Sequence, residues 1–306
     1  MEPAFAIGLD LGGTNLKGGL VSASGELSAY THSPSRVDES AQAPIDALRQ
    51  AIEGLAASAP GRVIALGLGC PGAIDPEEGC LVGRTAHLRH WESFPLRTSV
   101  QSLFGGPVVV DNDANFAALA EHRLGAARDA RVSLTITMGT GVGCGIVDRG
   151  RVVHGARGGA GEIGHLPLDG RIPCACGVPG CVEPECSGPG LVARAREAGL
   201  AIESPAQVYA LAAAGEPRAS ALVARQADRL GATIAIAVQI LNPDVVVIGG
   251  GVANSGELLL APLREAVARY ALPSHAGVRI ERAALGEAAG TIGAGLAAWD
   301  RANAAD

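Results

Sequence analysis

Hydrophobic and β-branched residues gather in short runs that end at glycine-rich turns, and this pattern predicts three strand-bearing segments. Residues 6–22 (AIGLDLGGTNLKGGLVS) predict a strand, a Gly-Gly-Thr-Asn turn and a second strand. Residues 132–155 repeat the scheme with a Gly-Thr-Gly turn and a third short strand. Residues 245–253 (VVVIGGGVA) predict a buried strand that ends in three glycines. The two similar hairpins suggest an internal duplication.

Amphipathic patterns fill the intervals between these segments and predict helices. They cover residues 44–58, 114–125, 190–199, 219–241 and 257–271, and the fourth stops at Asn242-Pro243. Alternating strands and helices predict a mixed α/β sheet in each half of the chain. The pattern changes near residues 115–125, so we expect an N-terminal α/β domain over 1–118, completed by a C-terminal helix over 293–306. The C-terminal α/β domain would then span 119–292.

Composition narrows the class of protein. The chain has 306 residues, of which 48% are hydrophobic and 43 are glycine, so it can bury one large or two medium cores built from aliphatic residues. A formal net charge of −7 without a basic run argues against a nucleic-acid partner, although backbone N–H groups can still hold small phosphorylated molecules. The sequence shows neither a signal peptide nor an apolar run of transmembrane length. We therefore expect a cytoplasmic protein with no membrane partner.

One loop concentrates the cysteines. Residues 164–186 hold His165 and four of the seven cysteines of the chain. A disulfide knot, a reactive thiol or a bound metal could explain this. The cytoplasm disfavours disulfides, and Cys174-Ala-Cys176 is too closely spaced for an easy mutual bond. Three thiolates and one imidazole, His165, Cys174, Cys176 and Cys181, match structural zinc in number and softness, and this interpretation is favoured. Thiol redox chemistry and plain buried thiols stay open.

Two carboxylates flank this loop. Glu162 lies three residues before His165, and Glu183 lies two residues after Cys181. If zinc fixes the loop, both carboxylates are held close together, where each can accept two hydroxyl hydrogen bonds from a polyhydroxylated ligand. Such a zinc would be architectural, because four protein ligands leave no open position. On the residues alone, simple solvation is the better explanation of Glu183.

Acidic residues also follow a predicted buried strand. In the run PVVVDNDANFAALAE, the predicted strand ends in Asp111-Asn112-Asp113 and an alanine-rich helix follows directly. Open α/β sheets place ligands at this end of a strand. Helix capping by Asn112 or Asp113 is the alternative, and it does not exclude catalysis. The helix N-terminus favours a charged carboxylate, so a base here would act by its position.

Glycine turns offer sites for phosphate. The segment DLGGT (10–14) combines unhindered N–H groups with Asp10, which could orient Mg²⁺ through water. Residues 137–143 and 249–251 form two similar turns. None follows the P-loop pattern or a Gly-x-Gly-x-x-Gly between strand and helix. A P-loop NTPase and a dinucleotide-binding fold are therefore disfavoured.

In this order and spacing, several of the segments resemble the ROK family of repressors and sugar kinases, within the actin-like ATPase superfamily. They are LDLGGTNLKGGLV, CPGAID, DNDANFAALAE, TMGTGVGCGI, GGAGEIGH, CACGVPGC and VVVIGGGVA. The resemblance covers nearly the whole chain. It implies an α/β, two-domain actin-like (ribonuclease H-like) fold in which ATP and a hexose meet in an interdomain cleft, and a homodimer or homotetramer.

The resemblance also implies residue roles. Asp113 would be the general base that takes the proton of the attacking sugar hydroxyl. The residues expected to hold the sugar are Gly72, Asn112, Asp113, Glu162, His165 and Glu183. Those expected at the nucleotide and its Mg²⁺ are Asp10, Gly12, Gly13, Thr14, Asn15, Lys17, Gly139, Thr140, Gly141, Gly249, Gly250 and Gly251. Zinc at the cysteine loop becomes a stronger expectation.

Substrate and class follow from two further segments. The first strand begins near Phe5, which leaves no room for the helix-turn-helix of the repressor members, so we expect a kinase. Residues 83–96 resemble a loop of glucokinase-like members, with His87 where these often carry asparagine. Glucose is the first expected substrate, followed by N-acetylmannosamine or N-acetylglucosamine, and then fructose. A sugar-sensing protein without catalysis is the non-enzyme alternative.

Overall fold

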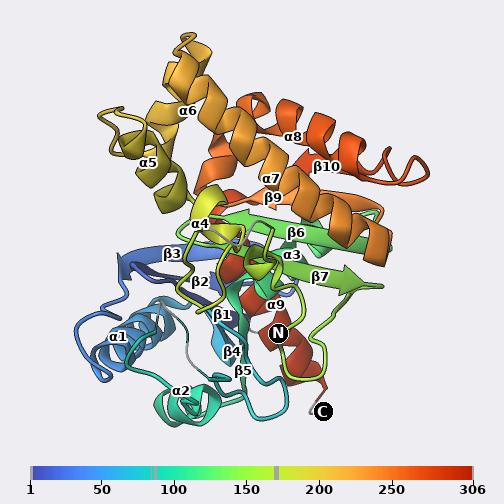
Figure 1. The fold of residues 1–306 in the computed structure, drawn as a ribbon. Helices are drawn as coiled ribbons and strands as arrows, with labels where there is room; N and C mark the ends of the chain where they lie inside the picture. The colour runs from blue at the N-terminus through green and yellow to red at the C-terminus, as the bar shows by residue number, and fades with distance from the viewer. Residues whose placement is uncertain (1–2, 84, 86–87, 169–171, 305–306) are drawn as a thin grey trace. The chain divides into compact units, whose positions relative to one another are not determined.

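The computed structural model describes residues 3–83, 85, 88–168 and 172–304. Its chain forms two five-stranded sheets with helices packed against them (Figure 1). Residue contacts group it into two compact units. The first unit comprises Met1–Leu124, Val152–Ala160 and Glu287–Asp306, and the second comprises Gly125–Arg151 and Gly161–Gly286. The domain division after residue 118 stays a prediction, and this grouping places the whole helix that ends at Leu124 in the first unit.

The first unit is built on a sheet with the strand order β3-β2-β1-β4-β5. Its strands are β1 (Ala4–Leu11), β2 (Asn15–Val21), β3 (Leu27–Pro34), β4 (Arg62–Cys70) and β5 (Val108–Asn112). Its helices are α1 (Ala43–Ser58), α2 (Leu96–Phe104), α3 (Asp113–Leu124) and α9 (Ala289–Asn303). The three strands β1, β2 and β3 pair antiparallel, whereas β4 runs parallel to both β1 and β5.

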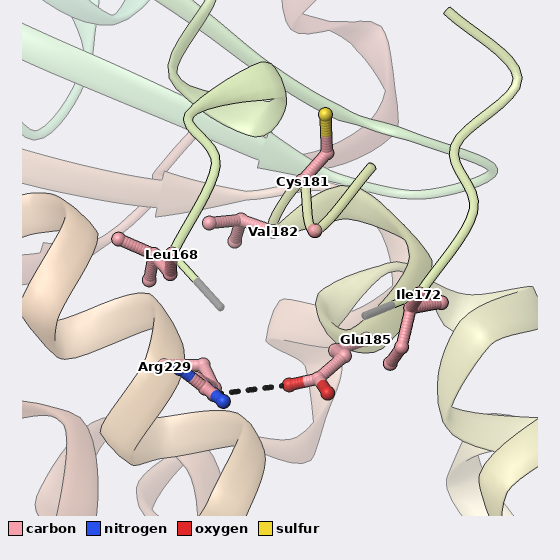
Figure 2. A pocket seen from close by; sticks show the side chains of 7 residues that line it. Leu168, Ile172, Cys181, Val182, Glu185 and Arg229 are labelled. Atoms are coloured by element: carbon pink, nitrogen blue, oxygen red, sulfur yellow. Dashed lines mark ion pairs between the residues drawn. The ribbon is translucent and has the colours of Figure 1, made fainter. Parts of the chain in front are cut away.

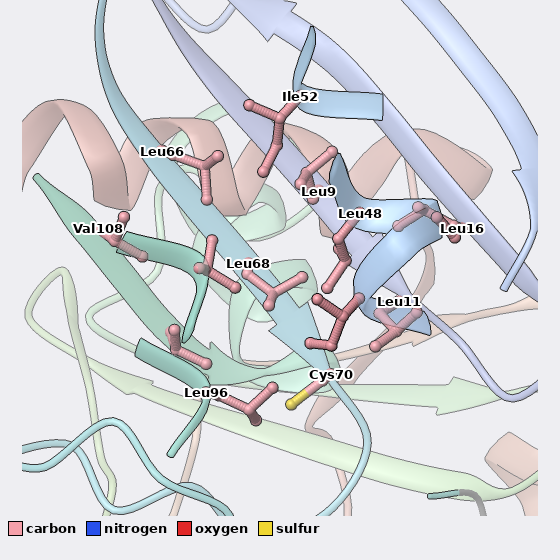
Figure 3. Packing of buried hydrophobic residues seen from close by; sticks show 14 of the residues in the cluster. Leu9, Leu11, Leu16, Leu48, Ile52, Leu66, Leu68, Cys70, Leu96 and Val108 are labelled. Carbon is pink, nitrogen blue, oxygen red and sulfur yellow. The ribbon is translucent and has the colours of Figure 1, made fainter. Parts of the chain in front are cut away.

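Strand β1 has two different faces. Leu9 and Leu11 belong to an apolar cluster with Leu48 of α1 and Leu96 of α2 (Figure 3). The opposite face carries Gly8, which leaves room for α9. A Cβ at this position would lie 2.0 Å from the carbonyl oxygen of Thr291 in that helix. Helix α9 therefore lies directly on the sheet backbone. Asp10 is the next residue on this face, since side chains alternate along a strand.

The second unit is built on a sheet with the order β10-β9-β6-β7-β8. Its strands are β6 (Val132–Met138), β7 (Val142–Asp148), β8 (Arg151–Val152), β9 (Val245–Gly249) and β10 (Arg279–Arg282). Its helices are α4 (Glu183–Cys186), α5 (Gly188–Glu197), α6 (Pro205–Ala213), α7 (Pro217–Leu241) and α8 (Glu257–Tyr270), with 3-10 turns at η1 (Ile163–His165) and η2 (Gly251–Ser255). A third such turn, η3 (Gly286–Ala288), precedes α9. Strand β6 pairs antiparallel with β7 and parallel with β9, which is parallel to β10.

The elements predicted from the hydrophobic pattern are confirmed, with shifted ends. The predicted helix over 114–125 begins at Asp113, the one over 219–241 begins at Pro217, and the one over 293–306 begins at Ala289. The pattern did not identify β3, β4, β10, α2, α4 or α6. Among the helices that the structure describes, we find none with the length and apolar character needed to cross a bilayer.

Candidate functional site

In the first unit, the predicted catalytic residue Asp113 and the predicted sugar ligand Asn112 lie where β5 passes into α3. The Asp113 carboxylate accepts a hydrogen bond from the backbone N–H of Ala114 at 2.8 Å, and Asn112 Oδ1 accepts from the same group at 2.9 Å. Asn112 Nδ2 donates to the carbonyl oxygen of Gly72 at 3.0 Å. Helix capping and a position at the strand end therefore coexist. Gly72, Asn112 and Asp113 lie together, as the resemblance implies.

Asp10 is the second acid of this region. It lies opposite Lys17 in the β1–β2 register, and a Cβ on Gly290 of α9 would lie 2.9 Å from its Oδ2. Burial and, to a smaller extent, the negative charge of Asp113 together raise the pKa of Asp10 to about 7, against the opposing charge of Lys17. A buried carboxylate next to a like charge is a good partner for a hard cation, because Mg²⁺ prefers oxygen ligands. This donor set fits the expected magnesium.

The glycine turn after β1 is closed by its own backbone. Gly12 N donates to the carbonyl oxygen of Asn15 at 2.8 Å, so residues 12–15 form a tight hairpin that includes Gly13 and Thr14. Lys17 Nζ donates to the carbonyl oxygen of Glu287, just before α9, at 3.5 Å. The predicted nucleotide residues of the first unit thus share one end of its sheet with Asp10.

The predicted metal ligands of the second unit lie together. One ligand atom from each of His165, Cys174, Cys176 and Cys181 is within 4.8 Å of all the others. Cys174 Sγ lies 3.6 Å from His165 Nδ1, and Cys176 Sγ lies 3.6 Å from Cys181 Sγ. Sulfurs about 3.8 Å apart are expected around tetrahedral zinc with Zn–S bonds of about 2.3 Å. The four cysteines of the loop are free thiols.

The other ring nitrogen of His165 faces a carboxylate. His165 Nε2 lies 3.9 Å from Glu162 Oε2. With Nδ1 directed to the sulfurs, a metal bound there would leave Nε2 beside Glu162. Partners of this kind orient metal-bound histidines in proteins. His165 can therefore ligate a metal and still present a polar atom beside Glu162.

Glu183 has a partner that the sequence did not reveal. Its Oε2 accepts a hydrogen bond from the backbone N–H of Val142 at 3.0 Å. Val142 follows Gly139-Thr140-Gly141 directly, and Gly139 O accepts from Gly188 N at 2.9 Å. One carboxylate expected at the sugar thus also holds the second glycine turn.

The third glycine turn lies next to the second. Strand β9 ends at Gly249, and Gly250 follows with φ +80°. A Cβ on Gly250 would lie 2.4 Å from the carbonyl oxygen of Met138, the residue before Gly139. Only glycine permits this approach. The residues predicted for the nucleotide in this unit, Gly139, Thr140, Gly141, Gly249, Gly250 and Gly251, therefore belong to two adjacent turns.

Ion pairs join helix α7 to α4 at the end of the cysteine loop. Figure 2 shows a small pocket lined by Leu168, Ile172 and Val182, where Glu185 pairs with Arg229. The Glu185 Oε2 to Arg229 Nε distance is 3.2 Å, and Arg225 pairs with the other oxygen. The pocket is mostly apolar, and its carboxylate already has cationic partners. It anchors α4, which carries Glu183, and offers no evident ligand site.

His154 is a member of the first site that was not predicted from the sequence. His154 Nε2 lies 2.7 Å from Asp111 Oδ2, although 43 positions separate the two residues. No spacing pattern could have indicated this pair. Position 87, where a departure from glucokinase-like members was noted, lies outside the described residues.

Comparisons with known proteins agree with this geometry. A glucokinase from Halalkalibacterium halodurans is 36% identical, over 96% of this chain and 95% of its own length. The crystal structure of a ROK hexokinase from Thermus thermophilus has a TM-score of 0.85 and 37% identity, covering 98% of this chain and 99% of that one. A ROK glucokinase from Streptomyces griseus, in complex with glucose and AMPPNP, has a TM-score of 0.85 and 30% identity, covering 97% and 99%.

These structures confirm the predicted actin-like α/β fold with two sheets. The model of the ROK family matches residues 6–301, which include both glycine hairpins, the Asp111-Asn112-Asp113 strand end and the cysteine loop. The chain belongs to the ROK family.

Proposed function

We propose that this chain is an ATP-dependent hexokinase that converts glucose to glucose 6-phosphate, with Asp113 as the general base. The observation that carries the proposal is the strand end of the first unit, where Asp113 is fixed beside Asn112 and Gly72. Relatives with this fold include a glucokinase in complex with glucose and AMPPNP. The sugar would be held by Gly72, Asn112, Glu162, His165 and Glu183.

The chemistry asks mainly for positioning. Transfer of a phosphoryl group needs an aligned acceptor hydroxyl and stabilised charge more than covalent help from the protein. The Asp113 carboxylate would accept the proton of the attacking hydroxyl, and the bond from Ala114 N fixes its orientation. Asp10 and Lys17 would lie at the phosphates of ATP, together with the N–H groups of the turn over 12–15. Magnesium bound at Asp10 would supply positive charge to the phosphates.

Structural zinc belongs to the same proposal. His165 Nδ1 and the sulfurs of Cys174, Cys176 and Cys181 have the softness and spacing that a tetrahedral site requires. The metal would stiffen a loop that contains few apolar residues, and so hold Glu162 and Glu183. A cytoplasmic location and a homodimer or homotetramer stay expectations, the second of which light scattering would check.

The decisive experiment follows ADP release with Mg²⁺-ATP and a panel of sugars. We expect the highest kcat/KM for glucose, compared with mannose, fructose, N-acetylglucosamine and N-acetylmannosamine. A higher value for an acetylated sugar would assign the chain to that substrate instead. Binding of a sugar without turnover of any would contradict the kinase and favour the sensor.

A further inference from the structure

Asp111, which is buried, and His154, which is half-buried, form a pair near the proposed catalytic residue. Asp111 is 7% exposed and lies on β5, one position before Asn112. Its Oδ1 accepts hydrogen bonds from Asn112 N at 2.7 Å and from Asn115 Nδ2 at 2.8 Å. Its Oδ2 lies 2.7 Å from His154 Nε2. One carboxylate therefore ties the strand end, the first turn of α3 and a distant segment together.

The contacts of Asp111 constrain the turn that carries the proposed base. Asn112 and Asp113 lie between Asp111 and Asn115 in the sequence. Asp111 Oδ1 accepts from the backbone of Asn112 and from the side chain of Asn115, so it closes this turn. Asn112 is held again by the carbonyl oxygen of Gly72. A shift of Asp111 would thus move Asn112 N and the start of α3 together.

The segment that brings His154 is itself firmly placed in the first unit. Ala160 N donates to the carbonyl oxygen of His154 at 3.1 Å, which closes the segment into a loop. Gly158 has φ +72°, and a Cβ there would lie 1.8 Å from the carbonyl oxygen of Ile74. The segment therefore contacts the chain two residues beyond Gly72 as well as Asp111. His154 is a fixed partner for Asp111.

Asp111 lies in a region with several negatively charged side chains. Burial raises the pKa of the Cys70 thiol well above its usual value, and the charges of Asp10, Asp111 and Asp113 add to this effect. These three carboxylates, on β1, β5 and the start of α3, therefore lie close enough to affect the same buried thiol. Burying a carboxylate near other negative charges costs free energy unless a cationic or hydrogen-bonding group pairs with it. His154 meets Asp111 directly, and Lys17 counters Asp10.

We propose that His154 is a positioning residue for catalysis: by pairing with Asp111 it fixes the turn that aims Asn112 and Asp113 at the sugar. The inference rests on the proposed kinase function. Without the imidazole, Asp111 Oδ2 would lose its charged partner and stay buried near two other acids. The carboxylate would then turn toward another partner, which weakens its hydrogen bonds to Asn112 N and Asn115 Nδ2.

The test compares His154→Ala with His154→Gln, whose amide can donate to Asp111 but carries no charge. Since small misplacements of reacting groups are costly, we expect kcat to fall roughly 10- to 100-fold in His154→Ala, and KM for ATP to change less than about threefold. His154→Gln should lose less. His275→Gln, a half-buried histidine of the second unit, is the matched control and should behave as wild type.

A pH series separates positioning from simple stability. The hydrogen bond to Asp111 raises the pKa of His154. The imidazolium is therefore present at low pH and is lost as the pH rises through that raised pKa. The ratio of wild-type kcat to His154→Gln kcat should be largest at low pH and decline as the pH rises. A kcat within about twofold of wild type in His154→Ala overturns the inference. The inference is also overturned if the ratio of wild-type to variant kcat is the same at every pH and the loss of kcat matches the loss of folded protein in thermal melts.

A double-mutant cycle with Asp111→Asn completes the test. Because the two side chains act as one unit, the losses in Asp111→Asn and His154→Gln should not add in the double variant. Additive losses would overturn the inference. The cycle is measured on kcat and also on the glucose dissociation constant, which needs no turnover. A wild-type chain without turnover would then count against the proposed function alone, and additivity in the dissociation constants would count against the role of His154.

Discussion

The two sheets share one plan and differ in the side chains at its key positions. Counted from the edge strands β3 and β8, both have the same order, and both join an antiparallel hairpin to two parallel strands. In the first hairpin, Asp10 and Lys17 face each other two residues before Gly12 and two after Asn15. At the matching place in the second, Thr137 faces Gly143. The backbone scheme is repeated, and the charge is not.

The ends of the last strands differ in the same way. Strand β5 ends in Asp111 and Asn112, and Asp113 opens the next helix. The equivalent strand β10 ends at Arg282 and is followed by two alanines. The second unit instead carries the cysteine loop, and Glu183 of α4 accepts a hydrogen bond from Val142 N at the start of β7. Two sheets with the same strand order thus carry different side chains, and with them different chemistry.

The largest effect is expected from replacing Asp113, the proposed base directly after β5 of the first sheet. Asp113→Asn keeps the size of the side chain and an oxygen that can accept from Ala114 N, but it removes the base. We expect kcat to fall about 10²- to 10⁴-fold, as is typical when a general base is lost. The glucose dissociation constant should change little. Steady-state kinetics and calorimetry measure the two, and substantial residual turnover would mean that another group takes the proton.

The second prediction concerns zinc, which is expected at the cysteine loop of the second unit. Cys176→Ser should reduce bound zinc from about one ion per chain, lower the melting temperature and reduce kcat/KM for the sugar roughly 10- to 100-fold through misplaced carboxylates. Elemental analysis and kinetics check this. Cys80→Ser, a half-buried cysteine of the first unit, is the control. Full activity in a zinc-free chain would remove the metal from the account.

The third prediction asks whether Glu183 serves the second hairpin as well as the sugar. Glu183→Ala removes the acceptor for Val142 N, whereas Glu183→Gln keeps an amide oxygen there. A hydrogen bond to a charged group is worth about 1.5–3 kcal/mol, so a partial loss at the turn should weaken AMPPNP binding a fewfold to about tenfold in Glu183→Ala. The measurement is made without sugar. Equal nucleotide affinity in both variants would restrict Glu183 to the sugar.

Local patterns made much of this architecture predictable, and long-range contacts limited the rest. The glycine turns, the Asp111-Asn112-Asp113 strand end and the metal ligands all lie in short continuous segments whose spacing carries their meaning. Strand β3 was missed because most of its residues are exposed, so it lacks an apolar run. The pairing of His154 with Asp111 and of Glu183 with Val142 depends on tertiary packing, which no spacing along the chain encodes.

The smallest expected effect concerns the opposite ends of the two sheets, where the parallel strands begin. In the first sheet, Arg62 N donates to the carbonyl oxygen of Pro3, a contact of backbone alone. In the second, Asp244 Oδ2 also accepts from Arg131 N at 2.8 Å and from Val132 N at 2.9 Å. These hydrogen bonds lower the pKa of Asp244. Its contribution to stability is therefore present above the usual aspartate pKa and is lost as the pH falls through the lowered one.

Asp244→Asn should consequently lower the melting temperature by about 2–4 °C at pH 7, the shift expected for roughly 1 kcal/mol in a protein of this size. The difference from wild type should shrink in acid, as the pH falls below the usual aspartate pKa and the wild-type carboxylate becomes protonated. Asp129→Asn, an exposed acid of the same unit, is the control. If the Asp244→Asn difference is the same at every pH, the carboxylate charge does not distinguish the second sheet from the first. The strand starts of the two sheets would then be held equally by their backbones.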